Sequence, residues 1–259
     1  MKKPKHFDKY LNANDSLYSN IVNKNLSKIK IFRIIYIRLK FYFRKFYFFR
    51  YLQKINLSTE KYTNSSTDIT VDGFQRSANT FAYVGFSILN RDIKIAHHSH
   101  VSSQIIFSVK NNIPVLLLIR DPIDSIVSFY IFLNEEVPFK TIINSWKNFY
   151  LPLIAHKKKI YVSDFDDTIN NFEETIDNVN SFYNTNFKSK FNGENFKEEI
   201  FKAIKQSHNN RFNKKLNKGS LALPVDSRNK KKRMLIFNIQ KNFQKEIEEC
   251  KIIYNKLLQ

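Results

Sequence analysis

Cysteine and glycine are scarce in this chain. Its 259 residues include one cysteine, Cys250, so no disulfide can form within the chain, and a reducing compartment fits that composition. Only four glycines occur, so a glycine beside a loop is informative about the backbone there. No uncharged run approaches the ~20 residues that cross a bilayer, and no apolar segment follows the basic start, as it would in a secretory signal. The sequence therefore predicts a cytoplasmic protein, with peripheral attachment to a membrane left open.

Acidic residues are also few, because 43 Lys and Arg face 23 Asp and Glu, for a net charge of +20. Such a charge favours polyanionic partners, which include nucleic acid, anionic membranes and phosphorylated ligands. An AT-rich genome would also enrich Lys, Asn, Ile, Phe and Tyr together without selection for any partner. No helix-turn-helix, zinc finger or RNA-binding motif is present, so no specific nucleic-acid partner is expected.

Residues 1–60 are predicted to form a basic, aromatic N-terminal extension. Within it, Lys28–Ile55 alternates aromatic or aliphatic residues with Lys and Arg, and the charges fall all round a helical wheel. Two interpretations stay open. The segment is a helix packed on the domain with its cationic side chains extended outward, or it lies on an anionic membrane surface. Residues 56–68 form a polar linker.

From residue 68 to the end at 259, strand and helix patterns alternate. Strands are predicted at residues 69–74, 93–100, 113–121 and 159–165, and helices at 80–90, 102–112, 122–135, 139–158 and 171–187. The run "IPVLLLIRD" is continuously apolar, which is typical of a central parallel strand covered on both faces. The pattern predicts a three-layer α/β/α domain with a central parallel sheet, similar to P-loop NTPases. Ligands of such sheets bind at the carboxyl ends of the strands.

The residues expected at those ends begin with "VDGFQRSANTF", which departs from the P-loop pattern G-x-x-x-x-G-K-[ST]. Gly73 and Thr80 match that pattern, but Ala78 replaces the second Gly and Asn79 replaces the Lys. The strand "VLLLI" is followed by Arg120 rather than by an acidic metal ligand. An arginine at this position would repel Mg²⁺ and attract an anion. With Arg76 placed earlier in the loop, the pattern predicts a metal-free site for a phosphate ester at a helix N-terminus.

Two motifs carry a resemblance to the PAPS-dependent sulfotransferases. "GFQRSANTF" resembles their 5′-phosphosulfate loop, and "LLIRDPIDSIVSFY" resembles their 3′-phosphate motif, about forty residues later as in that family. The resemblance covers residues 70–132, is weaker from 156 to about 240, and is not seen before 60. It implies that residues 68–259 form a sulfotransferase domain, with PAPS as co-substrate and no metal.

The resemblance also implies roles for individual residues. Arg76, Ser77, Asn79 and Thr80 would hold the 5′-phosphosulfate, within a cofactor-binding loop that includes Gln75 and Ala78. Arg120 and Ser128 would hold the 3′-phosphate, because charge-assisted Arg contacts suit a phosphate dianion. Arg76 would also neutralise the leaving group and so act in catalysis. A C-terminal basic loop over the cofactor is suggested by Lys218, Gly219, Ser220 and Arg228, although a solvated loop explains these residues equally well.

A catalytic base is expected in "AHHSH", after the second strand, where family members often carry a His. A histidine can remove the proton of an acceptor hydroxyl near neutral pH. If the segment is extended, His98 and His100 share one face and His97 lies on the other. His98 is the first candidate and His100 the second. Asp164, after the fourth strand, is expected to be structural.

Three functions are compatible with these features: a sulfotransferase, a P-loop kinase-like nucleotide enzyme, and a non-catalytic basic protein that binds membranes or nucleic acid. Asn79 and the missing acidic metal ligand disfavour the kinase. The acceptor of a sulfotransferase would carry a free hydroxyl, on a saccharide, a glycolipid or a small compound, and the sequence does not choose among them.

The membrane interpretation of Lys28–Ile55 predicts that the full chain sediments with anionic liposomes. Deletion of residues 1–60 should then abolish sedimentation, since the basic and aromatic side chains that would contact the lipid are removed. A full chain that stays in the supernatant at low ionic strength would exclude membrane contact through this segment.

Overall fold

The structure, a computed structural model, describes residues 35, 39, 62–211 and 229–259. The expectations for Lys28–Ile55 and for the basic loop with Arg228 therefore lie outside the described residues, apart from the two isolated positions. Within the described part of the chain, no helix is both long enough and apolar enough to cross a membrane.

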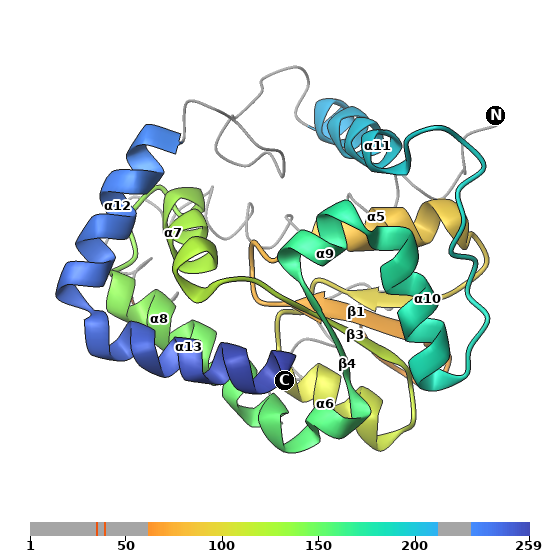
Figure 1. Ribbon diagram of the computed structural model, residues 1–259, viewed down its shortest axis with the longest axis horizontal. Helices are drawn as coiled ribbons and strands as arrows, with labels where there is room; N and C mark the ends of the chain where they lie inside the picture. The colour runs from red at the N-terminus through yellow and green to blue at the C-terminus, as the bar shows by residue number, and fades with distance from the viewer. Residues whose placement is uncertain (1–34, 36–38, 40–61, 212–228) are drawn as a thin grey trace.

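A four-stranded parallel sheet forms the centre of the domain (Figure 1). Its strands are β1 (Ile69–Gly73), β2 (Ile95–His97), β3 (Val115–Ile119) and β4 (Tyr161–Asp164), in the order β2-β1-β3-β4. Helices separate the strands along the chain and cover both faces of the sheet. The expected three-layer α/β/α architecture is thus confirmed, and each of the four predicted strands is present.

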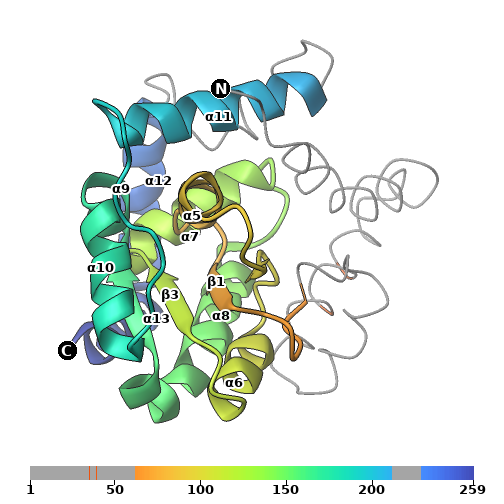
Figure 2. The ribbon, with the colours of Figure 1, turned by 90° about the vertical axis from the view of Figure 1, so that its right-hand side faces the viewer.

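The helices form two layers around this sheet. They are α5 (Asn79–Leu89), α6 (Ser102–Lys110), α7 (Pro122–Phe132), α8 (Phe139–Tyr150), the 3₁₀ helix η2 (Leu151–Lys159), α9 (Phe165–Asn170), α10 (Phe172–Tyr183), α11 (Phe196–Arg211), α12 (Asn229–Asn242) and α13 (Gln244–Leu258). One core joins the sheet to α6, α7, α8, α12 and α13, and the other joins it to α5, α10 and α11. Figure 2 shows α11 beside α5, with α6 on the opposite side of the sheet.

Strand β3 divides its side chains between these two cores. Val115, Leu117 and Ile119 pack into the first core, whereas Leu116 and Leu118 pack into the second, and all five are fully buried. Alternate residues of a strand point to opposite faces. An uninterrupted apolar sequence is therefore required here, because neither face of β3 meets water.

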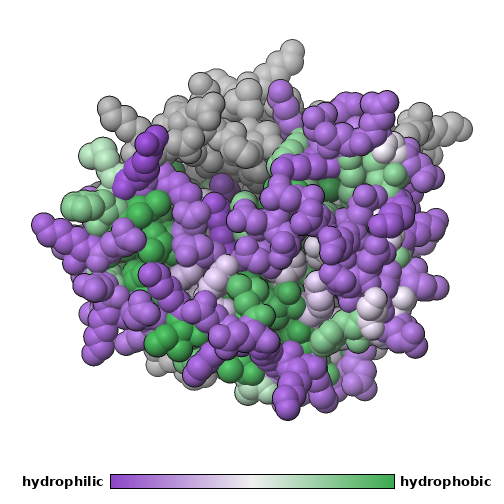
Figure 3. Space-filling model, viewed as in Figure 1, coloured by the Kyte–Doolittle hydropathy of each residue, from purple (hydrophilic) through white to green (hydrophobic). Residues whose placement is uncertain are grey.

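The outer surface differs from these cores in polarity. Most of the face in Figure 3 is hydrophilic, and apolar side chains show there in separate groups. The exposed large apolar residues of α12 and α13 are Met234, Phe237, Ile252 and Leu258. Isolated exposures of this kind are normal for a folded domain.

The order of the strands positions the ligand site. From β1 the chain passes to the edge strand β2 and then returns across to β3, on the other side of β1. Helix α5, which follows β1, lies on one face of the sheet, and α7, which follows β3, packs with the core of the other face. The loops after β1 and β3 thus part in opposite directions at the carboxyl ends of the strands, which is where ligands of open α/β sheets bind.

Two differences from the expected element boundaries affect the segments around the site. The helix predicted at 139–158 is α-helical only to Tyr150 and continues as the 3₁₀ helix η2, in which Pro152 lacks the N–H that an α-helical bond requires. The strand predicted at 93–100 ends at His97, because His98 and His100 take left-handed conformations with φ of 54° and 52°.

Gly73 lies close against β3 across the sheet. A Cβ at this position would overlap the backbone carbonyl of Leu118, the residue paired with Gly73 across the sheet. Since that carbonyl belongs to a buried strand, it cannot move aside as a side chain could.

We expect Gly73→Ala to lower the free energy of unfolding by roughly 1–3 kcal/mol or more, through overpacking. The matched control is Gly193→Ala, whose added Cβ would have the ring of Phe191, and not backbone, as its nearest neighbour, in an exposed segment. Denaturant unfolding of both variants measures the difference. Equal stability of the two would show that β1 and β3 can separate at little cost.

Candidate functional site

The loop after β1 adopts the shape of an anion-binding turn. Arg76 and Ala78 take left-handed conformations, with φ of 72° and 64°. Helix α5 begins directly afterwards, its first helical bond runs from Ala82 N to Ala78 O, and no side chain caps its N-terminus. The N–H groups at the start of α5 therefore have no helical acceptor, and such groups favour a bound anion.

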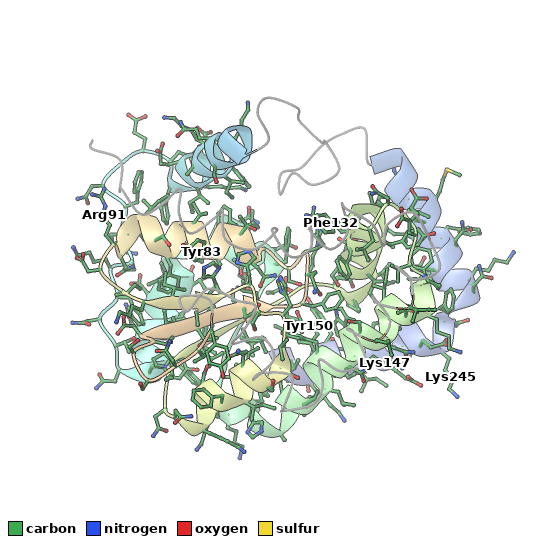
Figure 4. All side chains as sticks on the ribbon, turned by 180° about the vertical axis from the view of Figure 1, so that it is seen from behind. Tyr83, Arg91, Phe132, Lys147, Tyr150 and Lys245 are labelled. Carbon is green, nitrogen blue, oxygen red and sulfur yellow. The ribbon has the colours of Figure 1, made fainter. Side chains whose placement is uncertain are left out.

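Tyr150, at the end of α8, fixes this loop to the sheet (Figure 4). Its hydroxyl donates to the Leu118 carbonyl at 2.8 Å and accepts from the Phe74 N–H at 3.0 Å. The same hydroxyl lies 3.4 Å from Ser77 Oγ. Burial raises the pKa of Tyr150, despite these hydrogen bonds, so the phenol stays protonated and remains a donor. Sequence patterns did not single out Tyr150, because nothing local distinguishes it from other core aromatic residues.

Arg120, directly after β3, extends toward the same loop. Its Nη1 donates to the Arg76 carbonyl at 3.2 Å, and its Nη2 lies 3.3 Å from Asp124 Oδ2. The guanidinium also covers the Phe165 ring, 4.0 Å from its centroid. These contacts hold the Arg120 guanidinium beside the loop after β1.

The Arg76 side chain extends from the loop after β1 to helix α7. Its Nε donates to Ser128 Oγ on α7 at 3.1 Å, and its guanidinium lies 5.5 Å from the Phe132 ring centroid. Arg76, Arg120 and Ser128 therefore form one connected group, although they come from two loops and a helix.

A cation from the C-terminal part of the chain joins this group. Lys232 on α12 forms an ion pair with Asp124 at 2.8 Å, and Asp124 also pairs with Arg120. Asp121 caps the start of α7, since its side chain accepts from the Asp124 N–H. Lys232 lies four residues beyond Arg228 in the basic run that the sequence marks. The run alone could not show which of its cations reaches the site.

The histidines after β2 are connected to the start of α5. His98 Nε2 lies 3.1 Å from Thr80 Oγ1, and His98 Nδ1 lies 2.6 Å from His97 Nδ1. His97 stacks on Tyr83 of α5, with ring centroids 3.6 Å apart. The rings of His98 and His100 lie 5.7 Å apart. They are neighbours because of the two left-handed residues, and not because they share a face of a strand.

His100 has a different set of contacts. Its Nδ1 donates to the Gly73 carbonyl at 2.7 Å and lies 3.3 Å from the buried carboxylate of Asp72. Burial raises the pKa of Asp72, but hydrogen bonds from His100 and Ser99 and the charge of His100 outweigh it, so the pKa lies below its usual value. The stabilisation from this carboxylate is therefore complete above the ordinary Asp pKa and is lost as the pH falls through the lowered value.

The other predicted loop residues are more enclosed. Ser77 is fully buried, and its N–H donates to the Phe74 carbonyl at 3.3 Å. Asn79 Nδ2 donates to the same carbonyl at 2.8 Å. Within the described residues, the buried oxygens Asn79 Oδ1 and Gln75 Oε1 have no hydrogen-bond partner. Asp164 accepts from Asp166 N and from the Tyr254 hydroxyl at 2.7 Å, which suits a structural residue.

Together, Arg76, Arg120, Lys232 and the N-terminus of α5 offer positive charge and N–H donors at one edge of the sheet. Such a set fits an anionic ligand such as a phosphate ester. Among the described residues, no three His, Cys, Asp or Glu side chains are grouped as metal ligands.

No protein-family model matches the chain, and no curated protein matches it. Among solved structures, the chain is similar to mouse sulfotransferase SULT7A1 complexed with PAP. The identity is 10% and the TM-score is 0.41, over 77% of this chain and 92% of the other. A similarity at this level carries no weight for the chemistry, which depends on the residues of the site itself.

Ala78 gives a test of the loop geometry. A left-handed Ala costs about 1–2 kcal/mol that Gly does not, although Gly loses part of this advantage through the greater entropy of the unfolded chain. We therefore expect Ala78→Gly to stabilise the protein by about 0.5–1 kcal/mol.

The matched control is Ala82→Gly, within the same helix, which should destabilise by about 1 kcal/mol or more. Chemical denaturation of both variants provides the measurement. Destabilisation by Ala78→Gly would contradict the left-handed conformation of Ala78.

Proposed function

We propose that this chain is a sulfotransferase that transfers the sulfuryl group of PAPS to an acceptor hydroxyl. The observation that carries the proposal is the hydrogen bond from the Arg120 guanidinium to the Arg76 carbonyl. It places arginines from the loops after β1 and β3 at the same position. A triphosphate enzyme needs a Lys in this loop and an acidic metal ligand nearby. This chain has Asn79 and Arg120 at those positions instead.

The connection through Arg76 supports a ligand with two anionic groups on one nucleotide. The Arg76 carbonyl accepts from Arg120, while the Arg76 side chain donates to Ser128. A nucleotide with a 5′-phosphosulfate and a 3′-phosphate would contact both ends of this group at once. In the proposal, Arg76, Thr80 and the first N–H groups of α5 hold the 5′ end, with Gln75, Ser77, Ala78 and Asn79 shaping the loop, and Arg120 and Ser128 hold the 3′-phosphate.

The proposed chemistry assigns two tasks to the protein. PAPS supplies an activated sulfuryl group when bound. Arg76 stabilises the negative charge that develops on the leaving oxygen, and a preorganised cation of this kind is often the largest catalytic contribution. A histidine, His98 or His100, takes the proton of the acceptor hydroxyl. In this proposal the acceptor is a saccharide, a glycolipid or a small hydroxyl compound, the three classes that the sequence allows.

Binding of adenosine 3′,5′-bisphosphate, the expected product, tests this proposal. We expect micromolar or tighter binding by titration calorimetry in EDTA, with weaker binding of AMP and of Mg-ATP. Arg120→Ala should lower the affinity for the bisphosphate at least about 30-fold, since the loss of a charge-assisted contact costs about 2 kcal/mol of binding free energy.

The matched control is Arg91→Ala. Arg91 is an exposed arginine just after the C-terminal end of α5. Figure 4 shows it on the opposite side of the molecule from Phe132. Its removal changes the net charge equally and should leave affinity within about twofold, since exposed charges at that range are screened. A preference for Mg-ATP would favour the kinase-like alternative. No nucleotide binding at all would favour the non-catalytic basic protein.

A further inference from the structure

Asp72 is a buried carboxylate with an unusually complete set of donors. It lies on β1, next to the loop, and is 1% exposed. Oδ2 accepts from Ser99 Oγ at 2.5 Å and from the His100 N–H at 2.9 Å, and Oδ1 accepts from the Gly73 N–H at 2.9 Å. A buried charge is costly unless it is paired in this way. Every bond except that of Gly73 connects β1 to the segment after β2.

The contacts of His100 determine which of its nitrogens carries the proton. Nδ1 lies 2.7 Å from the Gly73 carbonyl and 3.3 Å from Asp72 Oδ1. Both oxygens are acceptors only, so the neutral ring keeps its proton on Nδ1. Nε2 then carries the lone pair, and no described residue lies within hydrogen-bond distance of it. The side chain is 16% exposed, so solvent or an acceptor can reach the ring.

The backbone is strained at both candidate bases. His98 and His100 are non-glycine residues with positive φ, a conformation that side chains disfavour. The Asp72 carboxylate holds His100 in this conformation through its backbone N–H. Such strain persists where the surrounding structure enforces it, and it is concentrated at functional sites.

His98 is held in a different way. Nε2 lies 3.1 Å from Thr80 Oγ1, and Nδ1 lies 2.6 Å from His97 Nδ1. Two nitrogens at that separation cannot both carry protons, so a proton taken up by one ring disturbs the pair. Both nitrogens of His98 are thus engaged with protein atoms, whereas Nε2 of His100 faces none of the described residues.

We infer that Asp72 is a positioning residue that holds His100 with its proton on Nδ1, and so makes His100 rather than His98 the base. The inference rests on the proposed function. The acceptor oxygen bonds to sulfur as the bond to the leaving oxygen breaks, the electron pair departs with adenosine 3′,5′-bisphosphate, and the acceptor proton moves to Nε2. Asp72 touches no reacting atom, and acts by orienting the ring and by stabilising the imidazolium that forms.

The position of the proton can be measured without an acceptor. The full chain, labelled with ¹⁵N in its six histidines, is studied by long-range ¹H–¹⁵N correlation at a pH where imidazoles are neutral. Loss of one signal set in His100→Gln assigns His100. We expect His100 to carry its proton on Nδ1 alone, and Asp72→Asn to lose this uniform state, because the amide presents N–H groups where the carboxylate accepts.

The control variant is Ser99→Ala, which removes one donor to Asp72 and leaves the carboxylate in contact with His100. We expect it to keep the proton of His100 on Nδ1. If Ser99→Ala and Asp72→Asn changed the proton position equally, the role of Asp72 would be packing of the segment and not positioning of the ring. The titratable side chains that face His100 among the described residues are Asp72 and His98.

Turnover gives a second readout, as slow transfer of ³⁵S from labelled PAPS to water. Loss of a general base costs about 10²–10⁴-fold, so His100→Gln should lose at least about 100-fold, while His98→Gln should lose less than about tenfold. Asp72→Asn should lower kcat with KM for PAPS within about threefold. All three variants should keep the affinity for the bisphosphate.

Two results would overturn the inference: a proton on Nε2 of His100 in the unsubstituted chain, or a greater loss of turnover in His98→Gln than in His100→Gln. If the unsubstituted chain fails to bind the bisphosphate, the proposed function fails, and the proton position still decides whether Asp72 orients His100. If Asp72→Asn does not fold, the unsubstituted chain and the two histidine variants decide.

Discussion

The close approach of β1 and β3 at Gly73 and Leu118 is the constraint on which the rest of the structure depends. No side chain fits between the two strands there, and the Tyr150 hydroxyl ties the Leu118 carbonyl to the Phe74 N–H just beyond. The loop after β1 must therefore begin directly beside the end of β3. This proximity lets the guanidinium of Arg120 donate to the backbone carbonyl of Arg76. The arginines of the loops after β1 and β3 therefore lie together.

A buried carboxylate organises the other side of the same loop. Asp72 connects β1 to the segment after β2 through Ser99 and His100. The residue next to it, Gly73, accepts from His100 and begins the loop to Arg76. The histidines and the anion-binding group thus contact the two ends of one short segment, Asp72 to Arg76.

The sequence predicted much of this arrangement, and its misses have physical causes. The apolar run of β3 and the start of the helix at residue 122 were correctly placed, because continuous burial and helical periodicity leave local signatures. The extension of β2 to His100 was wrong, because the hydrogen bond that the His100 N–H donates to a distant carboxylate, that of Asp72, outweighed the local preference of the backbone. Lys232 and Tyr150 were missed, because their contacts lie about a hundred and about thirty or more residues away in sequence.

The sequence by itself determined the alternation of strands and helices, the departure of the loop from a triphosphate pattern, and the kinds of side chain at the strand ends. These follow from periodicity and residue type, which are local properties. Only the tertiary structure decided that Arg76 reaches Ser128, that Arg120 reaches the loop backbone, and that Asp72 rather than another carboxylate contacts His100. The reason is that the order of the strands sets these contacts, and strand order arises from packing of the whole sheet against both layers of helices.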